Sequence, residues 1–140
     1  MTPLSIQTKL EMLGVSTAKV PTSGPGYDNA VKFAVELRLK RIEKGLRYAE
    51  KQLSFAEKEV ELWGNEVVRW KLKVEQAMET HHKVKTRHTL LLKVAEEQLN
   101  VAAESTERWI SEAASQAVQV KRWTGLKQQV ESFREEFSSE

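Results

Sequence analysis

A series of thirteen apolar residues at heptad spacing constrains the fold of this chain more than any other feature. From residue 35 to residue 77 the spacing alternates between four and three, and every position is apolar: Val35, Leu39, Ile42, Leu46, Ala49, Leu53, Ala56, Val60, Trp63, Val67, Trp70, Val74 and Ala77. In a chain that is 40% apolar, such a series arises by chance with a probability of roughly 10⁻⁵. It predicts a long α-helix with a narrow apolar seam, which another helix must cover.

The chain from residue 27 onward favours helix throughout. All three prolines lie before residue 26, and Asp28 is a suitable N-cap residue. Oppositely charged pairs four residues apart, such as Glu36 with Lys40 and Glu43 with Arg47, support a helix as well. We therefore expect residues 27–140 to form an all-α domain, a long antiparallel helical hairpin or coiled coil.

Residues 80–88 are the expected place for the chain to reverse. This segment, THHKVKTRH, is polar, contains all three histidines and interrupts the seam. A reversal there gives two arms of similar length, near 28–80 and 88–138. Turns between helices usually carry Gly or Asn, however, and this segment has neither. A mostly continuous helix in an oligomer therefore stays an alternative, as do breaks at Gly64-Asn65, Ser105-Thr106 or Gly125.

The two arms of a hairpin would have complementary side chains. With a turn centred near residue 84, Trp123 would face Gly45, and Trp63 would face the small residues of 102–105. Large side chains opposite small ones satisfy close packing, so we interpret the tryptophans as interface residues rather than as a stacking platform for bases. The predicted helix–helix interface includes Leu39, Ile42, Leu46, Leu53, Val60, Trp63, Val67, Trp70, Trp109 and Trp123.

A second apolar row lies beside the main seam. Tyr48, Phe55 and Leu62 are seven residues apart and therefore share one line along a helix. Two helices alone bury little apolar surface, so a second row indicates a further protein partner. We expect either self-association into a homo-oligomer, such as a four-helix bundle, or docking into a larger assembly.

Residues 1–26 are predicted to form a flexible N-terminal arm. Residues 14–26, GVSTAKVPTSGPG, have the composition of a linker. Before them, Ser5 can cap a short helix that ends at Gly14. This helix would carry Ile6, Leu10 and Leu13 on one face. Because so short a helix is unstable alone, we expect either a frayed tail or a peptide that docks on a partner.

Basic side chains form the candidate contacts for an anionic partner. Several recur at helical spacing away from the seam, and a fold-back would add others from the second arm; the candidates are Lys40, Arg41, Lys44, Arg47, Lys51, Lys121 and Arg122. Such a stripe can bind the phosphates of duplex RNA or DNA. Glu43, Glu50 and Glu57 line the neighbouring position, and the chain has 22 basic and 20 acidic residues. A solvated charged face is therefore the simpler interpretation.

Sequence patterns of enzymes are absent. The chain has no cysteine, no glycine-rich phosphate loop and no GxSxG motif. His81 and His88 would lie about 10 Å apart along a helix, too far to share one metal ion. We expect no catalysis, cofactor, metal or small-molecule substrate. There is no signal-peptide pattern and no apolar run of about 20 residues, so we expect a protein without membrane contact, in the cytoplasm or inside a viral particle and not secreted.

These features together favour a structural or assembly protein. We expect a rigid helical scaffold or adaptor that joins protein partners within a larger macromolecular complex. The alternative is a nucleic-acid-binding helical dimer that uses the basic stripe.

Overall fold

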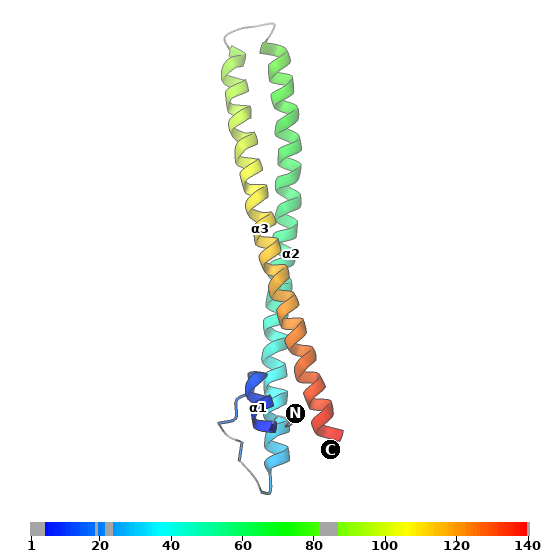
Figure 1. The fold of residues 1–140 in the computed structure, drawn as a ribbon. Coiled ribbons are helices and arrows are strands. Elements are labelled where there is room, and N and C mark those ends of the chain that lie inside the picture. Colours follow the sequence, from blue (N-terminus) through cyan, green and yellow to red (C-terminus); the bar gives the residue numbers. More distant parts are fainter. Residues whose placement is uncertain (1–4, 19, 22–23, 82–86, 140) are drawn as a thin grey trace. The chain divides into compact units, whose positions relative to one another are not determined.

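The computed structural model is built from helices. It describes residues 5–139 apart from 19, 22–23 and 82–86, and of residues 80–81 and 87–89 it describes only the backbone. Within this part of the chain, the regular elements are α1 (Ile6–Met12), α2 (Tyr27–His81) and α3 (Arg87–Ser139) (Figure 1). The two long helices pack against each other, so the predicted all-α class is confirmed.

The reversal of the chain falls between α2 and α3. Since α2 ends at His81 and α3 begins at Arg87, the interval lies inside the predicted segment 80–88, although residues 82–86 are outside the described part. Helix α2 runs through Gly64-Asn65, and α3 runs through Ser105-Thr106 and Gly125. The alternatives of a break at these places and of one continuous helix are therefore wrong.

The chain divides into two compact units. Unit 1 comprises Met1–Glu50 and Val118–Glu140, and unit 2 comprises Lys51–Ala117. All thirteen residues of the predicted seam are buried or half-buried, both those in unit 1 and those in unit 2.

Unit 1 holds an apolar core of large side chains. The core contains Leu10, Val15, Val31, Val35, Leu39, Ile42, Val130 and Phe133, contributed by the N-terminal segment, α2 and α3. The helices are antiparallel here, because Arg134 of α3 forms an ion pair of 2.9 Å with Glu36 of α2 while the Trp123 indole packs on Gly45. Gly45 and Trp123 are the pair that the predicted register brings together.

Unit 2 has a thinner core. Its buried residues, among those described, are all alanines: Ala56, Ala95 and Ala102. The larger seam residues Trp63, Val67 and Trp70 are only half-buried. Phe55 of α2 meets Trp109 of α3 edge to face, with 5.5 Å between ring centroids. A pair of helices thus covers this seam from one side and leaves its flanks in solvent.

The N-terminal segment packs on its own chain. Ser5 caps α1, and its side chain accepts a hydrogen bond from the Thr8 amide at 3.2 Å. Leu10 is 1% exposed in the core of unit 1, and Ile6 and Leu13 pack against that core. The sequence left a frayed tail or a partner-bound peptide as possibilities for this segment. The structure instead covers the apolar face of α1 with residues of α2 and α3.

Neither long helix, over the part that the structure describes, has a stretch apolar enough to cross a membrane.

Candidate interaction surfaces

The residues of the predicted second row lie in both units. Tyr48 belongs to unit 1, whereas Phe55 and Leu62 belong to unit 2. All three are exposed, Phe55 at 53% and Leu62 at 58%. Phe55 also contacts Trp109 through one edge of its ring, so it takes part in the interface between α2 and α3 as well. Exposed apolar residues at regular spacing on one helix are typical of a surface that meets a partner.

Helix α3 extends this row in unit 2. Val94 and Val101 are exposed, and each directly precedes a buried alanine of the seam, as Phe55 and Leu62 directly precede seam residues of α2. Equivalent heptad positions of two antiparallel helices lie on the same flank of the pair. Four exposed side chains therefore share one flank of unit 2, and we call this set the apolar face: Phe55, Leu62, Val94 and Val101. The two valines were not predicted from the sequence, although their seven-residue spacing repeats that of the row on α2.

The tryptophans pack within the units. Trp123 lies on Gly45 and Trp109 lies against Phe55. The Trp70 indole N–H donates to a Glu66 carboxylate oxygen at 3.2 Å, and the Lys73 ammonium lies 4.6 Å from the Trp70 ring centroid. The polar edge of Trp70 is thus engaged by neighbours on its own helix, and its remaining surface belongs to the seam.

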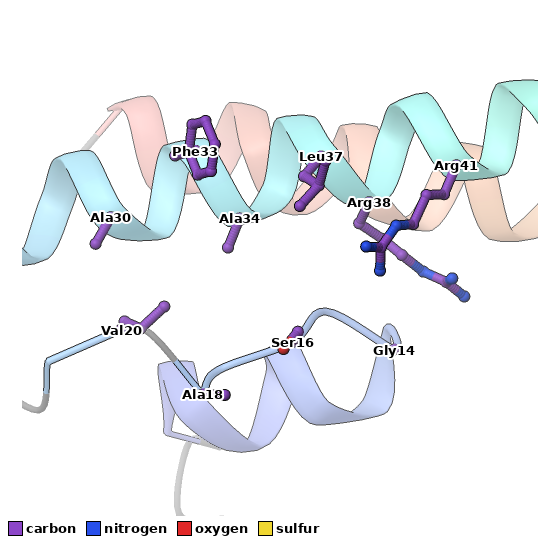
Figure 2. Close-up of a pocket in the computed structure, with 10 residues that line it drawn as sticks. All are labelled: Gly14, Ser16, Ala18, Val20, Ala30, Phe33, Ala34, Leu37, Arg38 and Arg41. Atoms are coloured by element: carbon purple, nitrogen blue, oxygen red, sulfur yellow. The ribbon is translucent and has the colours of Figure 1, made fainter.

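A groove in unit 1 lies between the N-terminal segment, represented by Gly14, Ser16, Ala18 and Val20, and the first turns of α2 (Figure 2). Its volume is about 290 Å³. Apolar side chains line most of it, and two arginines lie at the end near Gly14; the lining includes Ala18, Val20, Phe33, Ala34, Arg38 and Arg41. The sequence gives no signal for this groove, because it exists only when the N-terminal segment returns to α2.

The seven basic candidates are all exposed. In unit 1, Lys40, Arg47 and Lys121 each directly follow a seam residue, whereas Arg41 and Arg122 each directly precede one. These two positions lie on opposite flanks of a helix pair. Arg47 also pairs with Glu43 at 3.9 Å. Lys51 belongs to unit 2. Within unit 1 the candidates therefore lie on both flanks of the helix pair.

Ionisable groups elsewhere form surface pairs. A hydrogen bond to Glu36 raises the pKa of Arg134, which is already a strong base.

Over the residues described, no three side chains of His, Cys, Asp or Glu come close enough to hold a metal ion. His82 and the side chains of His81 and His88 lie outside the described part of the chain.

Comparisons with protein-family models, with curated proteins and with solved structures find no match to this chain. The class of protein that the fold defines is an all-α chain of two long packed helices with a docked N-terminal helix.

Proposed function

We propose that this protein is a non-enzymatic scaffold or adaptor, which self-associates through the apolar face of unit 2 into a four-helix coiled-coil bundle within a larger assembly. The observation that carries this proposal is the contrast inside unit 2. Its described buried residues are alanines, while Phe55, Leu62, Val94 and Val101 are exposed. A second pair of helices laid on this flank would cover both the exposed side chains and the half-buried tryptophans of the seam.

The magnitude of this burial favours reversible association. Fully burying a Val, Leu or Phe side chain contributes about 1.5–3 kcal/mol, and these side chains are already about half covered. Four of them on each of two copies would together contribute on the order of 8 kcal/mol. Association itself costs about 4–15 kcal/mol. We therefore expect an oligomer whose population depends on protein concentration, strengthened where other components of an assembly hold the copies together.

Light scattering on the full chain tests the proposal. Across a hundredfold range of concentration, the mass should rise from that of one chain to a multiple of it. Leu62→Glu and Val101→Glu should each hold the mass at one chain while the ellipticity at 222 nm is unchanged. Val68→Glu is the matched control, because Val68 is also exposed on α2 but follows a seam residue and so lies on the opposite flank. A single-chain mass at every concentration, or an equal effect of Val68→Glu, would refute self-association through this face.

Duplex RNA or DNA is the second candidate partner. Lys40, Arg41, Lys44 and Lys51 are exposed, and none of them forms an ion pair with another described residue. Their distribution over different flanks makes this proposal the weaker one. In a shift assay with a short duplex, phosphate binding would show a steep loss of affinity between 50 and 200 mM salt, and joint charge reversal at Lys44 and Arg47 would abolish it. Absence of a shift at low salt would remove this candidate.

A further inference from the structure

We propose that the groove of unit 1 binds an acidic amphipathic helix of a partner protein. One apolar side chain of that helix enters the groove, and a carboxylate one heptad further pairs with Arg41 and Arg38. The site shares no residue with the apolar face of unit 2. This proposal rests on the proposed adaptor function in one respect: the ligand of the groove is a protein.

The groove is built to accept an apolar side chain. The small residues Ala30 and Ala34 of α2 leave space, and Ala18 and Val20 line the groove from the other side (Figure 2). Phe33, which also lines the groove, is 72% exposed. The volume of about 290 Å³ is just below the range of about 300–1,000 Å³ for ligand sites. It offers room for a few side-chain atoms rather than for a cofactor.

One end of the groove is positively charged. Arg38 donates a hydrogen bond from its Nε to the Leu13 carbonyl oxygen at 3.1 Å, which fixes the guanidinium. Gly14 allows this approach, because a Cβ there would lie 2.8 Å from Nη2 of Arg38. Arg41 extends toward the same end (Figure 2) and is exposed.

The charge of these two arginines is not neutralised by the described part of the chain. Neither Arg38 nor Arg41 forms an ion pair with a described carboxylate, whereas Glu36 pairs with Arg134 and Glu43 pairs with Arg47. Guanidinium groups bind carboxylates through paired hydrogen bonds, and they do so most strongly beside an apolar surface that excludes water. An apolar groove with two guanidinium groups at its end, neither in an ion pair with a described residue, therefore complements an apolar ligand that carries an acid.

A helix fits this surface better than other occupants. Ala34, Arg41 and Tyr48 are one heptad apart on α2, so successive positions are separated by about 10 Å along the helix. Tyr48 is exposed. A partner helix laid along this line would meet an apolar, a basic and an apolar site in turn. It should carry apolar, acidic and apolar residues at seven-residue intervals. A nucleic-acid backbone would leave Phe33 and the groove unused, and a small amphiphile would not reach Tyr48.

Peptide selection on the full chain tests the proposal. The probe is a displayed library of random helical peptides, depleted first on the variant Ala34→Trp, whose indole fills the groove. The enriched peptides should carry an acidic residue with apolar residues one heptad to either side. In fluorescence anisotropy, synthetic versions should bind at least tenfold more weakly to Arg41→Glu and to Ala34→Trp than to the unmodified protein. If Ala34→Trp fails to fold, the surface variant Arg41→Glu still decides the result and serves for depletion.

Control variants separate this site from the others. Lys44→Glu reverses an exposed charge that does not line the groove, and it should change peptide affinity less than threefold. Leu62→Glu should leave peptide binding intact even where it abolishes self-association, so that the two proposals can fail independently. The proposal would be overturned if the enriched peptides lacked an acidic residue, or if they bound Arg41→Glu as tightly as the unmodified protein. Displacement of the peptide by a short RNA duplex, with the same dependence on Arg41, would overturn it in favour of nucleic acid.

Discussion

At Gly45 the missing side chain lets the Trp123 indole pack directly against α2. A Cβ at this position would lie 2.9 Å from the Trp123 ring, closer than such contacts occur. Glycine in the interior of a helix costs about 1 kcal/mol relative to alanine, so α2 gives up intrinsic helix stability here in exchange for the contact with α3. Gly64 also lies inside α2, but a Cβ added there would meet no atom within 4 Å apart from its chain neighbours and the backbone of its own helix. The two glycines therefore separate the effect of packing from that of helix propensity.

Alanine at these two glycines should change stability in opposite directions. Gly45→Ala should lower the free energy of unfolding by about 1–3 kcal/mol, because the indole must shift to avoid the new methyl group. Gly64→Ala should raise it by up to about 1 kcal/mol, the difference in helix propensity. Urea unfolding followed by ellipticity measures both. An equal gain in stability at both sites would show that Trp123 does not lie on Gly45.

The ion pair between Glu36 and Arg134 should contribute little, despite its short distance of 2.9 Å. Both side chains are about half exposed, and exposed pairs are worth about 0.2–1 kcal/mol. A double-mutant cycle with Glu36→Gln and Arg134→Gln should therefore give a coupling energy below about 1 kcal/mol, which decreases further with added salt. A coupling of several kcal/mol that is insensitive to salt would contradict this expectation.

Helix α1 shows what local sequence determines and what it does not. Ser5 and Gly14 mark the ends of the short helix, because capping and the left-handed backbone at Gly14, with φ of 74°, are local properties. The place where Leu10 docks depends instead on residues more than a hundred positions away, such as Val130 and Phe133. No periodicity within α1 contains that information.

Removal of the Leu10 side chain should release α1 from the core. Leu10→Ala loses a fully buried side chain, a change that typically costs about 2–5 kcal/mol. The hydrogen bond from the Val15 amide to the Leu10 carbonyl, 2.9 Å long, reports the docked state. Its amide hydrogen should exchange more than tenfold faster in the variant. Met12→Ala is the control, since Met12 is 70% exposed, and it should leave the exchange rate nearly unchanged.

The two long helices were unequally predictable. The seam of α2 is apolar at every position, so its pattern is regular and its burial follows from the sequence. In α3 the half-buried residues include Thr106 and Gln116, which break the apolar pattern. Both are satisfied locally: the Thr106 hydroxyl donates to the Ala102 carbonyl at 2.8 Å, and the Gln116 amide donates to Glu112 at 3.1 Å. A polar residue whose hydrogen bond is made within its own helix can occupy a seam position. The apolar pattern of the sequence does not reveal such a position.

For the whole molecule, the two units differ in how much large apolar side chain each buries. Unit 1 encloses Leu10, Ile42 and Phe133 among others, whereas the described buried residues of unit 2 are alanines. Local stability follows the amount of apolar surface buried. The apolar row on α2 could be predicted because its spacing is visible in one helix. The contrast between the units could not be predicted from the sequence, because α1 completes the core of unit 1 and not that of unit 2.

Native-state hydrogen exchange should resolve the two units. At low protein concentration, core amides of α2 in unit 1, such as that of Ile42, should exchange at least tenfold more slowly than amides of α2 in unit 2, such as that of Val67. Protection of Val67 should rise with protein concentration in the unmodified chain and stay constant in Leu62→Glu, because self-association stabilises unit 2 by mass action. Equal protection of both amides at all concentrations would contradict the difference between the units.

The placement of the indoles has a practical consequence. Trp123 belongs to unit 1, while Trp63, Trp70 and Trp109 belong to unit 2. Tryptophan emission would come only from unit 1 in a chain with phenylalanine at those three positions, and only from unit 2 in a chain with Trp123→Phe. Intrinsic fluorescence can therefore follow the melting of each half of the molecule without any attached dye.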